Sequence, residues 1–450
     1  MTLDVRGKRV AVVGLASSGL AAVRALAGAG ARVRVTEARA RQEVAEAAAE
    51  AESLGADVRA GGHAPAHLNG VDVVVTSPGV SEHADVLRWA ASSGLPVWSE
   101  LEVGARLARC PYVGITGTNG KTTTTEMVAA VMRRAGLDAL ACGNVGYPFS
   151  AAAGEPRDAL AVEASSFQLR FHESFRPRVS VLLNAAVDHV DWHGSPHRYR
   201  DAKRGIFVLQ GRDDVHVGNR DDDVAAGMSR TAPCRAVWFT LRRPADGEVG
   251  YEGGELVSRL AGEHRLGRPA ADAPSHRANA AAAAAAALSF GLVAEPVAEA
   301  LQVFPPLPHR GQVVVEVRGV RFVNDSKATN PHAALATLGG FPRAVLICGG
   351  RSKGVDLSPL REAVSRLAGV VVIGEAADEL AEIFGDRIPV HRASSIEEAV
   401  AQAYGLASAS VPVVLAPACA SWDMFRDYRE RGDRFTAAAR ALGSQGQEAV

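Results

Sequence analysis

A glycine-rich loop near residue 120 is the strongest chemical signal in this sequence. It follows an apolar run, Tyr112 to Thr116, and precedes a helical pattern that extends to about Arg134. Backbone N–H groups of such a loop point at phosphate oxygens, and the dipole of the following helix favours negative charge. The general phosphate-loop motif needs a glycine where this chain has Ile115, so the loop is a variant of that motif. The loop comprises Gly117, Thr118, Asn119, Gly120, Lys121, Thr122 and Thr123.

This loop predicts a nucleoside triphosphate site, and the alternative is a glycine-rich turn that binds no ligand. Lys121 would neutralise the β- and γ-phosphates, and Thr122 would ligate Mg²⁺. Glu163 ends another predicted strand, where a carboxylate is a natural Mg²⁺ partner. Asp188 and His189 lie just past the next strand pattern. His189 is either a ligand of a second metal ion or a structural histidine, and the sequence alone leaves both open.

Lysine is rare in this chain, which makes each lysine informative. Of the 49 basic residues only five are lysines, and Lys8 is expected at the surface before the first strand. Arginine cannot replace lysine where chemistry needs a compact charge or an amine that can lose its proton. The other four, Lys121, Lys203, Lys327 and Lys353, are therefore candidates for chemistry. For Lys203 the alternative is a lysine on a helix surface.

Two polar segments in the last third follow predicted strands. Residues 324–330 read NDSKATN and residues 349–353 read GGRSK. Because α/β sheets place ligands at the carboxyl ends of their strands, both segments are candidate binding loops. A polar surface loop is the alternative for the first of them.

The N-terminal glycine turn, residues 14–19, resembles a dinucleotide turn but lacks one of its glycines. Ala16 stands where the fingerprint needs a glycine for close approach of a pyrophosphate, which argues against NAD. Glu37 ends the second strand, where an acid could bond a ribose hydroxyl. The turn is either part of a mononucleotide-type pocket or purely structural.

Composition excludes several classes of protein. The formal net charge is −1, so no basic excess indicates binding to nucleic acid or to an anionic membrane. The five cysteines are scattered singly, which favours a reducing, cytoplasmic location. We see no signal peptide and no apolar stretch long enough for membrane insertion. The alanine-rich tract 278–288 is expected to form a buried helix.

Strand and helix patterns alternate along the chain, which predicts an α/β fold with parallel sheets. We expect three domains: a Rossmann-like N-terminal domain over 1–99, a central mononucleotide-binding domain with a phosphate loop and a parallel sheet over 100–306, and a Rossmann-like C-terminal domain over 307–450. Prolines at 305, 306 and 308 suggest a stiff linker, and 242–275 is expected to form loops or a hairpin. A hairpin is also expected over 313–323, turning at Arg318 and Gly319.

Taken together, these motifs resemble the Mur ligase family, and within it the member that adds D-glutamate. The resemblance covers nearly the whole chain in order. The phosphate loop alone would fit any Mur ligase or a folylpolyglutamate synthase, whereas SSFQL, NDSKATN and PACAS are more specific. The motifs are GTNGKTT at 117–123, GNVG at 143–146, EASSFQL at 163–169, DHVDWHG at 188–194, YRDAK at 199–203, LPHR at 307–310, NDSKATN at 324–330 and PACASWDMF at 417–425.

The resemblance implies an ATP-dependent amide ligase of peptidoglycan precursor synthesis. Its three domains would bind the UDP-sugar, ATP and the incoming amino acid. The substrate UDP-N-acetylmuramoyl-L-alanine would be activated as an acyl phosphate, and D-glutamate would then attack it. The resemblance also implies two Mg²⁺ ions and a monomer. A cationic lysine cannot ligate a cation, so Lys203 would act as its carbamate.

The resemblance assigns residue roles at matching positions. The implied catalytic residues are Lys121, Glu163, His189, Lys203 and Lys327. The implied metal ligands are Thr122, Glu163, His189 and Lys203. Further ATP contacts are Asn279, Arg310 and Asp325, beside the loop 117–123. The implied UDP-sugar contacts are Leu15, Ala16, Glu37, Arg39, Ser77, Pro78, Gly79, Asn144, Ser165 and Gln168. The implied D-glutamate contacts are Thr329, Lys353, Ser421 and Tyr428.

Other functions fit the sequence less well. A related ligase with a different amino acid is disfavoured by the N-terminal Rossmann-like block and by PACAS. A nucleotide-binding regulator would keep the loop but would not need Lys203, Lys327 and Lys353 as well. A dehydrogenase is disfavoured by Ala16.

Overall fold

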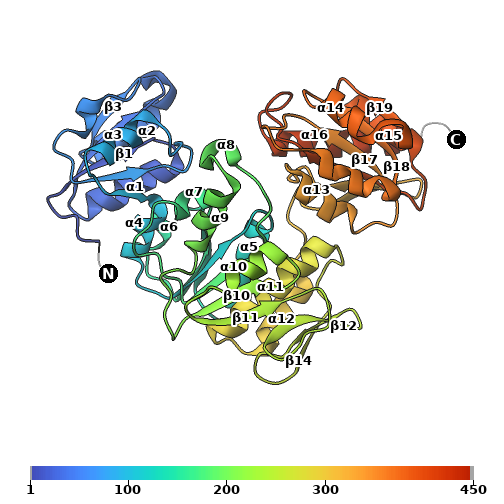
Figure 1. Cartoon of the computed structure of the whole chain (residues 1–450), viewed down its shortest axis with the longest axis horizontal. Helices are drawn as coiled ribbons and strands as arrows, with labels where there is room; N and C mark the ends of the chain where they lie inside the picture. The colour runs from blue at the N-terminus through green and yellow to red at the C-terminus, as the bar shows by residue number, and fades with distance from the viewer. Residues whose placement is uncertain (1–2, 446–450) are drawn as a thin grey trace. The chain divides into compact units, whose positions relative to one another are not determined.

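The computed structural model describes residues 3–445, which form two compact units. Unit 1 comprises the chain up to Pro269 together with Ala278–Phe304, and unit 2 comprises Ala270–Arg277 and the chain from Pro305 onward (Figure 1). Unit 1 contains two sheets and unit 2 contains one. Within the described residues, no helix has the length and apolar character needed to cross a membrane.

The first sheet is fully parallel, with strand order β3-β2-β1-β4-β5. Its strands are β1 (Arg9–Val13), β2 (Arg32–Glu37), β3 (Asp57–Ala60), β4 (Val73–Thr76) and β5 (Val97–Ser99). The helices of this part are α1 (Ser17–Gly28), α2 (Ala45–Ser53), α3 (Asp85–Ser92) and α4 (Glu100–Leu107), with short 3-10 turns at Arg41–Val44 and Pro65–Leu68. The order reverses between β1 and β4, which is where open α/β sheets bind ligands.

The second sheet has nine strands in the order β14-β13-β12-β11-β10-β9-β6-β8-β7. Its strands are β6 (Tyr112–Thr116), β7 (Ala139–Gly143), β8 (Ala159–Glu163), β9 (Val179–Leu182), β10 (Val215–Asn219), β11 (Arg235–Phe239), β12 (Glu248–Glu252), β13 (Glu255–Ser258) and β14 (His264–Gly267). Its helices are α5 (Lys121–Arg134), α6 (Phe149–Ala152), α7 (Ser166–Leu169), α8 (Val190–His193), α9 (Pro196–Arg204), α10 (Asp223–Ser229), α11 (Pro274–Phe290) and α12 (Ala294–Val303). Within the run β12-β11-β10-β9-β6-β8-β7, all paired strands are parallel to one another.

Both faces of this sheet are buried, as alternate residues of its strands show. Ala159 and Ala161 of β8 face the core that includes α5 and α11, whereas Leu160 and Val162 face a second core on the other side. The alanines 280–287 of α11 are all fully buried. Their small side chains let the helix lie close to its neighbours, and the expected buried helix is confirmed.

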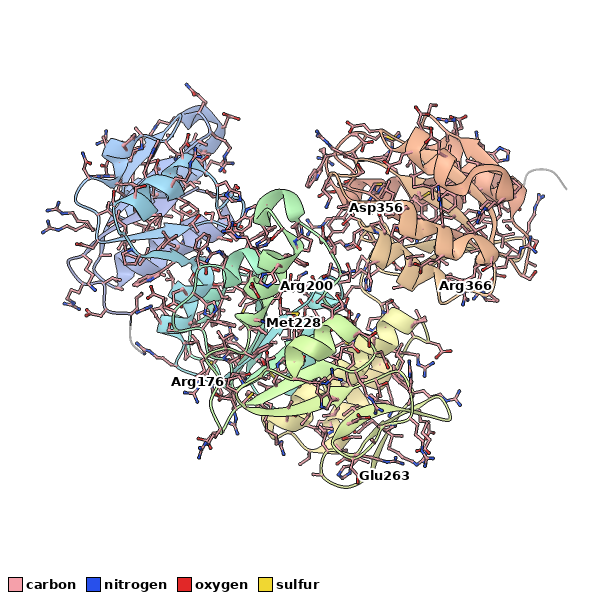
Figure 2. The ribbon with its side chains drawn as sticks, in the orientation of Figure 1. Arg176, Arg200, Met228, Glu263, Asp356 and Arg366 are labelled. Carbon is pink, nitrogen blue, oxygen red and sulfur yellow. The ribbon has the colours of Figure 1, made fainter. Side chains whose placement is uncertain are left out.

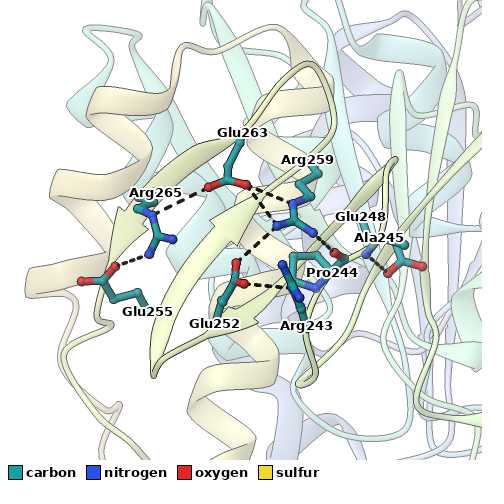
Figure 3. Close-up of polar contacts among 9 residues, drawn as sticks. All are labelled: Arg243, Pro244, Ala245, Glu248, Glu252, Glu255, Arg259, Glu263 and Arg265. Carbon is teal, nitrogen blue, oxygen red and sulfur yellow. Dashed lines mark hydrogen bonds and ion pairs between the residues drawn. The ribbon is translucent and has the colours of Figure 1, made fainter.

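The edge formed by β12, β13 and β14 is an antiparallel meander. Arg259 follows β13 and pairs with Glu252 and Glu263 at 3.3 and 3.0 Å, while it also donates to the carbonyl oxygen of Pro244 at 2.7 Å (Figure 3). Arg265 joins the same network through Glu263. Charged side chains on an edge of this kind discourage pairing with another chain.

The third sheet lies in unit 2, with strand order β15-β16-β20-β17-β18-β19. Its strands are β15 (Gln312–Val317), β16 (Val320–Asn324), β17 (Ala344–Gly349), β18 (Leu367–Ile373), β19 (Val390–Arg392) and β20 (Val413–Ala418). Its helices are α13 (Pro331–Leu338), α14 (Ala377–Phe384), α15 (Ile396–Leu406) and α16 (Tyr428–Gln445), with 3-10 turns at Ser358–Arg366 and Gly385–Arg387. All neighbouring strands are parallel except β15 and β16.

The fold class predicted from the sequence is confirmed, and so is the hairpin over 313–323. Arg318 and Gly319 have φ of 48° and 83°, which is the left-handed pair that a tight two-residue hairpin turn requires. Two local predictions were incomplete. The hairpin expected within 242–275 is present as β12 and β13 but continues into a third strand, β14, and α11 begins at Pro274 instead of Ala278. Proline is favoured in the first turn of a helix, because its missing N–H has no partner there.

Candidate active site

The glycine loop connects the carboxyl end of β6 to the first turn of α5. Gly120 caps the helix with φ of 85°, a left-handed conformation that favours glycine. A Cβ atom at Gly120 would lie 2.4 Å from Oδ1 of Asn279, so a side chain has no room there. The oxygen of Asn279 is also 3.3 Å from the hydroxyl of Thr124. Asn279, a predicted ATP contact, therefore packs directly against the loop.

A second asparagine, which the sequence analysis missed, fixes the middle of the loop. Oδ1 of Asn184 accepts from the N–H of Asn119 at 2.8 Å, and its Nδ2 donates to the Asn119 carbonyl at 3.1 Å. Asn184 follows β9, the neighbour of β6, so the sheet brings it to the loop. The hydroxyl of Thr118 lies 3.0 Å from both the Ala186 carbonyl and the Tyr199 hydroxyl.

Two of the four candidate lysines meet at one carbonyl group. Nζ of Lys121 donates to the carbonyl oxygens of Gly117 and Thr118 at 2.9 and 3.0 Å. Nζ of Lys203, which comes from α9, donates to the same Gly117 oxygen at 2.8 Å. Lys203 is 1 % exposed, which rules out the alternative of a lysine on a helix surface.

The surroundings of Lys203 favour its neutral amine. Burial lowers its pKa well below the usual value, and the positive charge of Lys121 lowers it further. The carboxylates of Asp188 and Glu163 act in the opposite direction, but more weakly. A neutral amine is nucleophilic, whereas an ammonium ion is not.

Glu163 lies at the end of β8, the other neighbour of β6, and is 2 % exposed. Its Oε1 accepts from Nδ2 of Asn144 at 3.0 Å, and its carbonyl accepts from the Asn144 N–H at 2.9 Å. Gly143, with φ of 114°, permits this approach, because a Cβ there would lie 2.2 Å from the Glu163 carbonyl oxygen. Asn144 was predicted to contact substrate, and the structure places it where it orients Glu163.

His189 precedes α8 with φ of 50° and is partly exposed. Its ring packs edge-on against Phe167, with centroids 4.8 Å apart, and Nε2 is 3.7 Å from Oδ2 of Asp188. His193, one helical turn later, is fully buried, and its Nε2 lies 3.0 Å from the Ser166 hydroxyl. Burial, aided by nearby positive charges, lowers the pKa of His193 to about 4, so this second histidine stays neutral.

The donors around the loop suit Mg²⁺. Within residues 3–445 no three His, Cys, Asp or Glu side chains form a cluster that could hold a metal ion alone. Mg²⁺ is usually held by one or two carboxylates together with substrate phosphates and water, so a complete protein cage is not required. Glu163 is a buried carboxylate beside a phosphate loop, and a carbamate on Lys203 would add a second anionic oxygen donor. The side chains present therefore fit the ion.

A hollow of about 300 Å³ lies between α9 and α10, on the helix that also carries Lys203. Arg200 and Met228 are among its lining residues (Figure 2), and Lys203 is not. The hollow is thus separate from the side of α9 that serves the loop.

The predicted UDP-sugar contacts of the first sheet lie at the carboxyl ends of β1, β2 and β4. Glu37 accepts from the Leu15 N–H at 2.6 Å and pairs with Arg39 at 3.0 Å. Burial alone would raise the pKa of Glu37, but hydrogen bonds from Arg39 and Leu15 hold it at about 2. Ser77 donates to the Gly14 carbonyl at 3.1 Å. These contacts order the turn, and Ala16, Pro78 and Gly79 remain at least partly exposed beside it.

Ser165 and Gln168, also predicted to contact the sugar substrate, form a reciprocal cap on α7. The Gln168 N–H donates to the Ser165 hydroxyl oxygen at 3.3 Å, and Gln168 Oε1 accepts from the Ser165 N–H at 3.0 Å. Nε2 of Gln168 reaches Glu100 at 3.4 Å, and the side chain is fully buried. Gln168 thus holds Ser165 in place, and its contact with substrate stays a prediction.

The remaining candidates lie in unit 2. Asp325 follows β16 and accepts a short hydrogen bond from the Thr337 hydroxyl. Burial raises the pKa of Asp325 to about 6, although Thr337 and Arg310 oppose the shift. Nζ of Lys327 lies 4.1 Å from the centre of the Tyr428 ring, a cation–π contact between two predicted site residues.

The three other predicted D-glutamate residues lie beyond adjacent strands, with Thr329 in the loop after β16. Lys353 has φ of 56° and follows β17, and Ser421 follows β20 and is 2 % exposed. Sequence reasoning missed Arg431 of α16, which is fully buried beneath these loops. The chain has 44 arginines, and no local signal in the sequence distinguishes Arg431 from the others.

Three family models match successive parts of the chain. The Mur ligase MurD-like N-terminal domain matches residues 8–99, the Mur ligase middle domain matches 115–287, and the Mur ligase glutamate ligase domain matches 309–419. Together they span most of the described residues.

Relatives of known function match over nearly the full length. The chain is 43 % identical over 448 residues to the UDP-N-acetylmuramoylalanine–D-glutamate ligase of Frankia casuarinae, covering 97 % of this chain and 94 % of the relative. It is 39 % identical over 447 residues to the enzyme of the same name from Trichlorobacter lovleyi, covering 98 % and 100 %.

Solved structures share the fold at low sequence identity. The MurF ligase of Thermotoga maritima, in complex with ADP, has a TM-score of 0.60 at 17 % identity and covers 98 % of this chain and 96 % of its own. The UDP-N-acetylmuramate–alanine ligase of the same organism has a TM-score of 0.58 at 18 % identity, covering 96 % and 99 %. Identity, coverage and three consecutive domain matches agree, and this chain belongs to the Mur ligase family.

Proposed function

We propose that this chain is an ATP-dependent ligase that joins D-glutamate to UDP-N-acetylmuramoyl-L-alanine in peptidoglycan precursor synthesis. The observation that carries the proposal is the meeting of Lys121 and Lys203 at the Gly117 carbonyl, beside the buried carboxylate of Glu163. This arrangement suits phosphoryl transfer, which needs positioning and fixed positive charge more than covalent help from the protein. The relatives named above support the choice of substrates.

The loop and Lys121 would bind the phosphates of ATP. The loop's N–H groups and the start of α5 supply a favourable field for phosphate oxygens. Lys121 would leave the Gly117 and Thr118 carbonyls and turn to the γ-phosphate, where its charge stabilises the transferring group. Two Mg²⁺ ions, when bound, would neutralise phosphate charge at Thr122, Glu163, His189 and the carbamate of Lys203. Asn279, Arg310 and Asp325 are proposed as further nucleotide contacts.

Lys203 is proposed to act as a carbamate. Its neutral amine attacks CO₂, a C–N bond forms, and one proton is released, which leaves an anionic carboxylate on the side chain. Burial disfavours the ammonium ion, and the positive charge of Lys121 disfavours it further and would then attract the product anion. Arginine is too basic to offer a neutral amine, which explains why a lysine stands here in an arginine-rich chain.

The proposed reaction has two steps. The carboxylate of the L-alanyl group attacks the γ-phosphorus, and ADP leaves with the bonding pair. The amine of D-glutamate then attacks the acyl carbon, and phosphate leaves as the amine loses a proton. Lys327 would contact the phosphates, while Thr329, Lys353, Ser421 and Tyr428 would hold D-glutamate. The loops at Leu15–Ala16, Glu37–Arg39 and Ser77–Gly79 would hold the UDP-sugar, with Asn144, Ser165 and Gln168 near the muramoyl-alanine end. We place the reaction in the cytoplasm and expect a monomer.

Phosphate release tests the proposal directly. The protein is supplied with ATP, Mg²⁺ and UDP-N-acetylmuramoyl-L-alanine, and then with D-glutamate, L-lysine, L-alanine or no amino acid. We expect rapid phosphate release only in the sample that also contains D-glutamate. Equal release with another amino acid, or with none, contradicts the specific assignment. Lys121→Met should abolish release, whereas Lys8→Met, which removes an exposed lysine, should not.

A further inference from the structure

Arg431 is a buried arginine that forms no salt bridge with any residue that the structure describes. It lies in the first turn of α16 and is fully buried. Charged side chains are almost never fully buried unless they are paired. Within the described residues, the hydrogen-bond acceptors of its guanidinium are neutral oxygens of Ser326, Gly349 and Cys419.

The three acceptor residues belong to three different segments of the chain. Nε donates to Oγ of Ser326 at 3.0 Å, and Nη2 donates to the Ser326 carbonyl at 2.8 Å. Nη1 is shared between the carbonyls of Gly349 at 3.4 Å and Cys419 at 3.2 Å. One planar guanidinium therefore joins three segments that are far apart in the sequence, a task that its fork of five donors suits and an ammonium group does not.

The three segments lie at the carboxyl ends of adjacent strands. Ser326 follows β16, Gly349 ends β17, and Cys419 follows β20, which pairs with both of the others. Each segment continues into one proposed D-glutamate residue, namely Thr329, Lys353 or Ser421. Arg431 thus contacts all three segments through one buried guanidinium group.

Two further contacts hold the surroundings of the Arg431 guanidinium in place. Oγ of Ser326 donates to the Tyr428 carbonyl at 2.7 Å, so the first residue of α16 is tied to the same loop. A Cβ on Gly350 would lie 3.3 Å from Nη1 of Arg431, so the glycine leaves room for the guanidinium. Ser326 is itself fully buried.

Within the described residues Arg431 forms no salt bridge, and the carboxylate of Asp423 offsets only part of the effect of its burial. Burial lowers its pKa to about 10, which still leaves the side chain cationic at neutral pH. A buried charge without a directly paired counter-ion is costly, and it attracts negative charge that enters nearby. An amino acid with two carboxylates and one ammonium group brings one net negative charge.

We propose that Arg431 is a positioning residue of the amino-acid site, which clamps the three loops and whose charge favours an acidic amino acid. The identity of that amino acid rests on the proposed function, whereas the clamp itself does not. Arg431 acts through the loops and does not contact the reacting atoms.

Kinetics of full-length variants test the effect on substrate. We compare Arg431→Lys and Arg431→Met with Arg434→Met, which removes an exposed arginine from the same helix that pairs with Glu397. We expect the KM for D-glutamate to rise about 10-fold in Arg431→Lys and about 100-fold in Arg431→Met, in proportion to the charge-assisted hydrogen bonds lost. The KM values for ATP and for the UDP-sugar should stay within about twofold, since those contacts are made elsewhere.

Hydrogen exchange of the substrate-free protein tests the clamp without any turnover. Amides of residues 325–329, 349–354 and 419–422 should exchange faster in Arg431→Met and at the wild-type rate in Arg434→Met. Unchanged exchange in all three segments, together with an unchanged KM for D-glutamate, overturns the proposal. If Arg431→Met does not fold, an unchanged KM for D-glutamate in Arg431→Lys overturns the proposal instead. If the wild-type protein does not use D-glutamate, the proposed function fails, and the exchange rates still decide the clamp.

Discussion

Lys203 shows how a single residue can be assigned by its surroundings. In the sequence it is one basic side chain in a polar helix, and in the structure it is buried with its amine 2.8 Å from the Gly117 carbonyl. A protonated Lys203 would place two ammonium groups on one carbonyl oxygen, since Lys121 binds the same atom at 2.9 Å. A neutral amine avoids this repulsion, and it is the form that reacts with CO₂.

We predict that a carbamate forms on Lys203 and that activity depends on it. Protein equilibrated with ¹³C-labelled CO₂ should show a carbamate carbon signal by NMR, and Lys203→Arg should lack it. The kcat of Lys203→Arg should fall by about 10²–10³-fold, as when one charge-stabilising group is removed from an active site. Arg204→Lys, at the neighbouring and partly exposed position, should keep its activity. An active Lys203→Arg enzyme would exclude the carbamate role.

At the scale of elements, the central sheet is fastened by a buried polar chain. The Ser180 hydroxyl of β9 donates to Gln210 Oε1 at 2.7 Å, so it accepts from Nδ1–H of His216 on β10, also at 2.7 Å. Nε2 of His216 then accepts from the Ser229 hydroxyl of α10 at 2.9 Å. Both ring nitrogens are satisfied in the neutral tautomer, and His216, Ser180 and Ser229 are fully buried.

We predict that His216 makes folding stability depend on pH. Burial lowers its pKa from 6.5 to about 3, so below pH 6.5 the unfolded chain binds a proton that the folded chain does not. The stabilisation is therefore complete above pH 6.5 and is lost as the pH falls towards 3.

In urea unfolding at a series of pH values, His216→Gln should be about 1–2 kcal/mol less stable at pH 7.5, because hydrogen bonds are lost. Its stability should also fall less steeply on acidification. His391→Gln, at an exposed histidine, should follow the wild-type curve, and an equally steep curve for His216→Gln would contradict the prediction.

At the scale of the whole molecule, the candidate residues fall into two compact units of the chain. It passes from one unit to the other three times, at residues 269–270, 277–278 and 304–305. The phosphate loop, Glu163, Lys203 and Asn279 belong to unit 1, whereas Asp325 and the D-glutamate candidates belong to unit 2. The contacts that fix the phosphate loop, from Asn184 and Asn279, lie entirely within unit 1.

We predict that a non-hydrolysable ATP analogue with Mg²⁺ protects residues 117–123 from hydrogen exchange. At about 100 times its Kd, the analogue should stabilise the binding-competent form by about 2.7 kcal/mol. Gly120→Ala should abolish this protection, since its Cβ would lie 2.4 Å from Asn279. Gly136→Ala is the matched control, because Gly136 has nearly the same φ, 86° against 85°, but open space around it. Equal protection in both variants would contradict the role of the glycine.

The sequence by itself determined the fold class and the place of the glycine loop between a strand and a helix. Both depend on local patterns, such as the apolar strand before the loop, the glycine at its end and the turn at Arg318 and Gly319. Three-dimensional contacts that span many residues leave no such pattern. The rare lysines pointed to Lys203, but its burial became visible only in the folded chain, where its amine donates to the Gly117 carbonyl.

The tertiary structure alone decided how the candidate residues are held. Gln168, expected at the substrate, proved to be fully buried with its amide donating to Glu100, and Asn144 proved to hold Glu163. Arg431 carries no sequence signal, because its meaning comes from three strand ends that are brought together only in the folded sheet. Local motifs can be found from residue type and spacing. Burial and hydrogen-bond partners depend on contacts between distant segments, which exist only once the chain has folded.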